Sequence, residues 1–261
     1  MVLVTFGRFV AAFAPRMKPK IRNRTMLPQL SLHKLLFAGL LFAATVTASA
    51  QKTTGTKRHL VEINTTAGRM VVELYNETPL HRDNFLKLVR EHYYDSTLFH
   101  RVIPGFMIQG GDPDSRKAED RSVPLGQGGP GYTIPAEIIP SLIHRNGALA
   151  AARQGDDVNP GKRSSGSQFY IVQGRTWRPA DLEKLEARVN EGLPDSLAMH
   201  YTPDQIQTYW TAGGAPHLDG GYTVFGQVLD GIEVLDLIAN QPCDGMDRPL
   251  ADVRMWMRVL Q

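Results

Sequence analysis

The segment FHRVIPGFMIQGGDP, residues 99–113, is the most unusual stretch of this 261-residue chain. It combines a bulky apolar run with one arginine, one glutamine and two phenylalanines, and it closes on Gly-Gly-Asp-Pro. No evident nucleophile lies within it. A surface built from these residues would therefore act through shape, apolar contact and hydrogen-bond donors rather than through covalent attack.

Short strands separated by Gly and Pro surround this segment. VEINTTAGRMVVELY, residues 61–75, has β-rich runs on both sides of Ala67-Gly68, which indicates a hairpin. The further strands that we expect are 97–102, 106–110, 147–152, 168–173, 222–229 and the alternating run 253–260. Many short strands with few helices predict a mainly β fold, closed as a barrel or packed as a sandwich.

Two helices are expected beside these strands. The first lies within residues 78–95, where Thr78 is the predicted N-cap and Pro79 the first helical residue, and apolar residues follow at helical spacing. The second is the shorter apolar segment 231–240.

About forty residues, 177–214, interrupt the pattern of strands. Two short helices fit this segment, at 179–190 and at 202–210, and Thr202 and Pro203 begin the second one. We interpret the segment as a helical insertion that decorates the surface. Its deletion should then leave a folded and active protein, because long surface insertions cost little closure entropy.

The charge of the chain is unevenly distributed. Its formal net charge is +3 and its isoelectric point is near 9.0. Residues 1–50, however, hold seven of the 29 Lys and Arg residues and no acid, so the rest has 22 basic and 26 acidic side chains, a net charge of −4. That balance gives no polybasic signature and argues against nucleic acid as a partner.

Residues 33–50 have the layout of a secretory signal peptide. A short positive region precedes an apolar stretch of 14 residues, and Ala-Ser-Ala ends at Ala50, the expected cleavage site. We expect export to the periplasm as a mature domain of residues 51–261, with Met26 as the true start and residues 1–25 as an upstream segment. The alternative is an uncleaved N-terminal anchor, although a membrane span needs about 20 apolar residues.

Spacing patterns argue against several kinds of catalytic site. The eight His residues form no H-x-x-E-H or H-E-x-x-H metal pattern, and there is no G-x-S-x-G nucleophile elbow. The single cysteine, Cys243, permits no internal disulfide, and we expect it to be a half-buried apolar residue. Residues 126–131 match G-x-G-x-x-G, but Pro130 lies where a nucleotide fingerprint needs a helix, so we expect a loop.

One reaction suits the residues of 99–113, because it needs no covalent catalyst. Rotation about a peptide bond must overcome about 18–20 kcal/mol, and at X–Pro bonds it takes on the order of tens to hundreds of seconds. In the twisted state the prolyl nitrogen loses amide resonance and becomes a better acceptor. An arginine that donates to it binds that state better than either ground state, which lowers the barrier. Arg101, Phe106, Met107 and Gln109 could supply the donor, two walls of an apolar slot and a backbone anchor.

The segment resembles the signature of the cyclophilin family of peptidyl-prolyl cis–trans isomerases. Later segments resemble that family's further blocks in the same order: GQGGPGYTIPAE (126–137), GALAAAR (147–153), SSGSQFYIV (164–172) and PHLDGGYTVFGQV (216–228). The likeness covers residues 58–261 apart from the insertion. It implies a closed eight-stranded antiparallel β-barrel capped by two helices, an active groove on its outer face, isomerase activity and no cofactor.

The resemblance also assigns site residues. Arg101 matches the family's catalytic arginine. The substrate-binding positions that it implies are Phe106, Met107, Gln109, Ala152, Arg153, Gln168, Tyr170, His217, Leu218 and Tyr222. No residue is assigned to a metal.

Four of these positions depart from the family's usual residues. Arg153 stands where Asn is usual and Tyr170 where Phe is usual, which adds a charge and a hydroxyl to the groove. His217 replaces the Trp of members that are sensitive to cyclosporin, and Tyr222 replaces their His; both substitutions resemble bacterial members. We therefore expect cyclosporin to bind weakly.

Each residue taken alone has a plainer interpretation, since large apolar side chains usually belong to a core and Arg101 could be a surface charge. The five ordered segments together outweigh it. His100 invites a role as general base, but strand alternation predicts it on the face opposite to Arg101. Two functions stay open: a monomeric isomerase that acts on proline-containing exported polypeptides as they fold, or a proline-binding chaperone module with little turnover.

Overall fold

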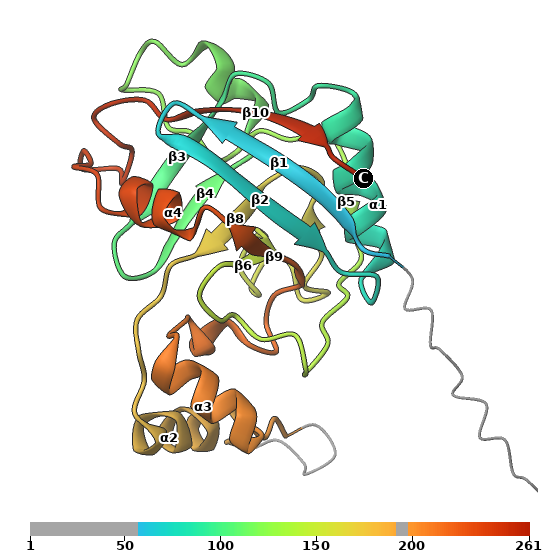
Figure 1. Cartoon of the computed structure of the whole chain (residues 1–261), viewed down its shortest axis with the longest axis vertical. Coiled ribbons are helices and arrows are strands. Elements are labelled where there is room, and N and C mark those ends of the chain that lie inside the picture. The colour runs from blue at the N-terminus through green and yellow to red at the C-terminus, as the bar shows by residue number, and fades with distance from the viewer. Residues whose placement is uncertain (1–56, 192–197) are drawn as a thin grey trace, which may run out of the picture. The chain divides into compact units, whose positions relative to one another are not determined.

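Eight strands close into an antiparallel barrel (Figure 1), which confirms the predicted fold. A computed structural model describes residues 57–191 and 198–261, so the predicted signal peptide and cleavage site lie outside the described residues. The strands of the barrel are β1 (His59–Thr65), β2 (Gly68–Leu74), β3 (Thr97–Ile103), β4 (Met107–Gly110), β6 (Ala148–Ala151), β8 (Phe169–Val172), β9 (Val224–Asp230) and β10 (Arg254–Val259). They are hydrogen-bonded in the order β1-β10-β3-β4-β8-β6-β9-β2.

Helices α1 (Pro79–Arg90) and α4 (Ile232–Ala239) lie at opposite ends of the barrel (Figure 1), and their apolar faces join its interior. Two 3-10 turns, η1 (Pro113–Lys117) and η2 (Pro216–Leu218), lie in the loops. A small sheet of β5 (Thr133–Ile134) and β7 (Ser164–Ser165), which the sequence did not predict, joins two of the loops beside the barrel.

Side chains alternate along the strands, so the two faces of the barrel wall hold separate apolar clusters. On β8, Phe169 and Ile171 belong to the interior cluster, whereas Tyr170 and Val172 belong to a second cluster. The interior is filled by tilted and edge-on aromatic rings: Phe85, Tyr94, Phe99, Phe169 and Phe225. The second cluster therefore forms an apolar surface on the outer wall, over β4, β8 and β6.

The N-terminus of α1 is capped differently from the prediction. Thr78 precedes the helix, but its hydroxyl is buried without a hydrogen-bond partner. The carboxylate of Glu137 instead accepts hydrogen bonds from the backbone N–H groups of Leu80 and His81, each at 3.0 Å. A carboxylate at this end also complements the helix dipole. The loop that carries residues 126–137 is thereby fastened to α1.

The insertion forms the two predicted helices, α2 (Pro179–Val189) and α3 (Pro203–Thr211), which lie together outside the barrel (Figure 1). Thr202 and Gln205 form a capping box at the start of α3. Leu182, Tyr201 and Tyr209 make a third apolar cluster, which includes Ile143 of the barrel side. The insertion therefore has a small apolar core of its own, to which Ile143, just before β6, also contributes.

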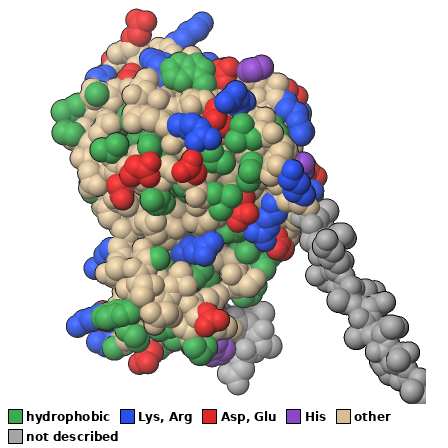
Figure 2. All heavy atoms as spheres, viewed as in Figure 1, with side chains coloured by type: hydrophobic (Ala, Val, Ile, Leu, Met, Phe, Trp, Pro, Cys, Tyr) green, Lys and Arg blue, Asp and Glu red, His purple; other side chains and the backbone are tan. Residues whose placement is uncertain are grey.

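The surface in view carries both signs of charge. Figure 2 shows Lys and Arg side chains interspersed with Asp and Glu over the barrel and the insertion. Of the helices that the structure describes, none has the length and apolar character to cross a membrane. Within residues 57–191 and 198–261, no group of three or more His, Cys, Asp or Glu could hold a metal ion. Cys243 is a half-buried free thiol, and burial raises its pKa.

Candidate active site

Strand β3 contains a bulge that changes which side chains face outward. Phe99 and Arg101 pair with consecutive residues of β4, so His100 is the extra residue. Phe99 and Val102 consequently belong to the interior cluster, while His100 and Arg101 line the same hollow on the outer wall. The prediction that places His100 on the face opposite to Arg101 is wrong, because strict alternation does not hold across a bulge.

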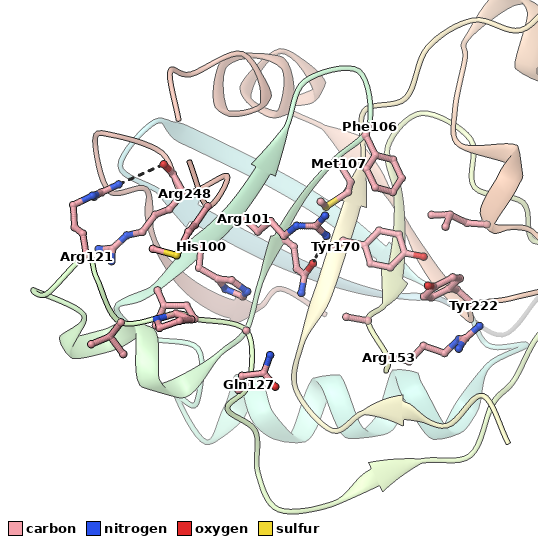
Figure 3. A pocket seen from close by; sticks show the side chains of 18 residues that line it. His100, Arg101, Phe106, Met107, Arg121, Gln127, Arg153, Tyr170, Tyr222 and Arg248 are labelled. Atoms are coloured by element: carbon pink, nitrogen blue, oxygen red, sulfur yellow. Dashed lines mark hydrogen bonds between the residues drawn. The ribbon is translucent and has the colours of Figure 1, made fainter. Parts of the chain in front are cut away.

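This hollow has a volume of about 340 Å³ and gathers most of the residues that the sequence assigned to the site (Figure 3). Nine of them line it: Arg101, Phe106, Met107, Gln109, Ala152, Arg153, Tyr170, Leu218 and Tyr222. Gln168 lines a second hollow, which shares Gln109, Ala152 and Arg153 with the first. His217 lies at the rim, where its ring is 5.2 Å from that of Phe106.

Arg101 is held at the middle of the groove by polar neighbours. Its Nη1 donates to Gln109 Oε1 at 3.5 Å, and its Nε lies 3.5 Å from Asp247 Oδ2. Gln109 Nε2 in turn donates to Gln168 Oε1 at 3.1 Å, and Gln168 Nε2 donates to the carbonyl of Gly128 at 2.8 Å. The side chain of Arg101 stays 44% exposed, so its guanidinium can meet a bound molecule.

An apolar slot lies beside this guanidinium, formed by Phe106, Met107, Tyr170, Leu218 and Tyr222 (Figure 3). Met107 and Tyr170 are buried at 2% and 4% exposure. The rings of Tyr170 and Tyr222 meet edge to face, with centroids 6.0 Å apart. Burial raises the pKa of the Tyr170 hydroxyl well above its usual value, so this wall of the slot carries no charge.

Arg153 lines the hollow, but its charge is engaged elsewhere. The guanidinium lies over the Tyr222 ring, 4.4 Å from the centroid, and Nε donates to the carbonyl of Gly221 at 2.7 Å. Nη1 lies 2.5 Å from the carboxylate of Asp156, and the side chain is 5% exposed. Arg153 therefore supports the edge of the slot, with its cation already paired.

His100 is enclosed by the loop of residues 126–131. Gly126, in the left-handed region at φ +95°, lies so close that a Cβ there would be 3.3 Å from His100 Nε2. Asp112 holds this loop by accepting from the N–H groups of Gly126 and Gly128 at 2.5 and 3.3 Å. Burial lowers the pKa of His100 to about 4, and neither ring nitrogen makes a hydrogen bond among the described residues. The imidazole is neutral and covered at ordinary pH.

The far wall of the hollow was not predicted from the sequence. It comes from two loops that are distant in the chain, and its residues are Arg121, Val123, Pro124, Leu125, Met246 and Arg248. Arg121 joins the loops, because its guanidinium lies 2.9 Å from Asp244 and 3.2 Å from Asp252. No local motif marks these positions, since only the closed barrel brings the two loops together.

Comparisons with known proteins agree with this geometry. Residues 60–258 match the family model described as "Cyclophilin type peptidyl-prolyl cis-trans isomerase/CLD". A Staphylococcus aureus protein named as a peptidyl-prolyl cis-trans isomerase is 34% identical over 197 residues, which are 74% of this chain and 87% of that protein. A Streptococcus pyogenes protein named as a bifunctional phosphatase and isomerase is 38% identical, over 74% of this chain and 37% of its own length.

Solved structures give the same result. A cyclophilin type peptidyl-prolyl cis-trans isomerase from Cryptosporidium parvum superposes with a TM-score of 0.57 at 27% identity, over 78% of this chain and 99% of that one. The same protein crystallised in the presence of the dipeptide Ala-Pro gives a TM-score of 0.55 at 27% identity, over 77% and 99%. The chain therefore belongs to the cyclophilin-type peptidyl-prolyl cis–trans isomerase family.

Proposed function

We propose that this protein accelerates rotation about X–Pro bonds of exported polypeptides, with Arg101 as the donor to the prolyl nitrogen. The observation that carries the proposal is the place of the Arg101 guanidinium, which Gln109 orients beside the apolar slot. A pyrrolidine ring would enter the slot between Phe106, Met107 and Leu218. The neighbouring hollow, which Gln168 lines, would take the flanking backbone.

In this mechanism the barrier falls because a fixed cation meets a developing lone pair. As the peptide bond twists, the prolyl nitrogen becomes pyramidal and accepts from Arg101, which is pre-oriented and needs no reorganisation. No proton changes place. The neutral, covered His100 takes no part in this mechanism, and it packs against the 126–131 loop.

The relative crystallised in the presence of Ala-Pro supports a proline-containing peptide as the ligand. The test is an exchange assay, by coupled proteolysis or by NMR, on a short X–Pro peptide with the protein of residues 51–261. We expect exchange much faster than in the absence of protein. Tight peptide binding without faster exchange would instead support the alternative, a proline-binding chaperone module.

We further propose that the protein acts after export to the periplasm, as a monomer, once the segment up to Ala50 is removed. The support is the positive, apolar and Ala-Ser-Ala layout of residues 33–50. N-terminal sequencing of protein from its native source should begin at Gln51, and light scattering should give the mass of one chain. A chain that keeps residues 26–50 and sediments with membranes would contradict export in soluble form.

A further inference from the structure

One buried carboxylate lies between the insertion and the groove. The side chain of Asp219, directly after η2, is 3% exposed. Its Oδ2 accepts from the hydroxyls of Tyr201 and Tyr209 of the insertion, at 2.9 and 2.5 Å. Burial, followed by the negative charge of Asp219, raises the pKa of both tyrosines, so both stay neutral and donate.

The other oxygen of this carboxylate holds a histidine. His144, which precedes β6, is 1% exposed at its side chain. Asp219 Oδ1 is 2.8 Å from the backbone N of His144 and 2.7 Å from its Nδ1. A carboxylate only accepts, so Nδ1 of His144 carries a hydrogen and donates to it.

His144 then reaches the wall of the slot. Its Nε2 lies 2.9 Å from the hydroxyl of Tyr170, and the two rings are stacked with centroids 6.0 Å apart. Burial keeps the hydroxyl of Tyr170 protonated, so it can donate to Nε2 or accept from it. A continuous chain of hydrogen bonds thus runs from Tyr201 and Tyr209 through Asp219 and His144 to Tyr170.

The residue that carries this carboxylate also borders the opposite wall. Asp219 follows Leu218 in the chain, and its backbone N–H donates to the carbonyl of Pro216 at 3.1 Å. The hydroxyl of Tyr201 lies 3.1 Å from that carbonyl too, so its one hydrogen is shared between the carbonyl and Asp219 Oδ2. The insertion therefore contacts η2, from which Leu218 lines the slot, through the Tyr201 hydroxyl.

The base of the insertion is equally close to this network. Gly214 pairs with Arg175, and the next residue, Ala215, donates its N–H to the carbonyl of His144 at 2.8 Å. Gly214 has a φ of +152°, and a Cβ there would lie 2.3 Å from that carbonyl and 2.6 Å from Tyr209. The insertion does pack outside the barrel, as predicted, but it is built into the support of the groove rather than laid over the surface.

We propose that Tyr201 and Tyr209 are positioning residues of the isomerase: through Asp219 and His144 they fix Tyr170 and Leu218, and so the width of the apolar slot. The inference rests on the proposed function of the slot. Removing the two hydroxyls leaves Asp219 Oδ2 without donors in a dry site, so the carboxylate has to shift or admit water, and both walls follow. Arg101 is untouched, so the loss should appear in binding.

The test is the double variant Tyr201→Phe/Tyr209→Phe in the protein of residues 51–261, assayed well below its unfolding temperature. We expect kcat/KM on an X–Pro peptide to fall between about twofold and thirtyfold, mainly through KM, the range typical of residues that act through a network. The matched control is Trp210→Phe, next to Tyr209 on α3 and 47% exposed, which should stay within twofold of wild type. If the double variant does not fold, the single variants Tyr201→Phe and Tyr209→Phe are assayed in its place, because each keeps one donor to Asp219.

A thermodynamic cycle with Tyr170→Phe separates positioning from mere stabilisation. If the network acts through Tyr170, the double substitution should have a smaller effect on kcat/KM in the Tyr170→Phe background, and the nitrogen NMR shifts of His144 should change when the two hydroxyls are removed. Unchanged kcat/KM, or an equal loss in both backgrounds, would overturn the inference. If wild type shows no turnover, the proposed function fails instead, and the same cycle is measured as the dissociation constant of the peptide.

Discussion

The two sides of the groove are built in different ways. On one side, Arg101 is oriented by Gln109 from the neighbouring strand and by Asp247 from a distant loop, and its side chain remains 44% exposed. On the other side, Tyr170 and Leu218 depend on a carboxylate and a histidine that are 3% and 1% exposed, and on tyrosines of the insertion. The Arg101 side (the exposed side) is thus set mainly within one hairpin and is in contact with water. The side of Tyr170 and Leu218 (the dry side) is set by distant residues in a dry interior. Substitutions should therefore separate the two, with turnover lost on the exposed side and stability and substrate binding lost on the dry side.

The largest expected effect is on the dry side, from Asp219→Ala. It leaves His144 and two tyrosines without their shared acceptor, and breaking a buried charged network commonly costs about 3–5 kcal/mol of unfolding free energy. Chemical denaturation measures it. Asp230→Ala is the matched control, because Asp230 is 68% exposed and pairs with Arg69 at the surface, where an ion pair is worth at most about 1 kcal/mol. Equal stability of both variants would remove the contrast between the two sides.

Arg101→Ala should lower the activity and leave the stability unchanged, the reverse of what we expect for stability at Asp219. Loss of one donor to a transition state costs about 2.7–4 kcal/mol, or roughly a hundred- to thousandfold in kcat/KM, while the barrel keeps its stability. Arg101→Lys should recover part of the rate, since it keeps the charge and loses the forked geometry. Arg90→Ala, at the exposed end of α1, is the control for removing a surface arginine. Near-normal turnover in a folded Arg101→Ala protein would rule out this mechanism.

A third prediction concerns His100, the buried residue beneath the exposed side. Burial lowers its pKa from 6.5 to about 4, despite the nearby negative charge of Asp112. The neutral form is favoured in the folded state, so its contribution is complete above pH 6.5 and is lost as the pH falls from there through about 4. The full loss is roughly 3 kcal/mol, because one pKa unit corresponds to about 1.4 kcal/mol.

Denaturation curves between pH 8 and pH 4 test this for wild type and His100→Phe. The difference in unfolding free energy between the two proteins should change with pH across that window. Substitution of His92, which is 74% exposed, should give the same pH dependence of stability as wild type. A pH-independent difference would mean that His100 is already charged or solvated in the folded protein.

The smallest effect is expected at the rim, for cyclosporin. His217 is exposed and contacts Phe106, so it offers less apolar area than the Trp of sensitive relatives. His217→Trp should tighten inhibition by about thirtyfold, the equivalent of an aromatic contact worth about 2 kcal/mol. The measurement is a cyclosporin titration of each variant, with inhibition expressed relative to that variant's own uninhibited turnover. Wild type inhibited as tightly as the Trp variant would show that position 217 does not control the affinity.

Most of the barrel and of the exposed side of the groove could be predicted from the sequence, because their information is local. Alternation on β8 separates Phe169 from Tyr170, and residues 99–113 place Arg101 near Phe106 and Met107 within one hairpin. Local patterns fail where an extra residue in a strand breaks the alternation of its side chains. The bulge at His100 reverses its face, and no pattern in the strand marks it.

The dry side could not be predicted, because its contacts join residues that are far apart in the chain. Asp219 lies 75 residues from His144, and nothing in PHLDGG shows that its aspartate accepts from the insertion. The start of α1 gives the same lesson on a smaller scale: Thr78 has the right residue type for a cap, yet the cap comes from Glu137, 57 residues beyond Leu80, whose N–H it accepts. A buried acceptor takes whichever donors the closed fold brings near it.

The close approach of Gly214 to the backbone of His144 limits how this sequence can evolve. The exposed positions of α2 and α3 are free to change, since they face water. At 214 itself any side chain would collide with the carbonyl of His144 and move the residue that supports the candidate groove. A descendant of this protein can therefore change the exposed part of its insertion at little cost, but it has to inherit the glycine, the aspartate and at least one tyrosine together.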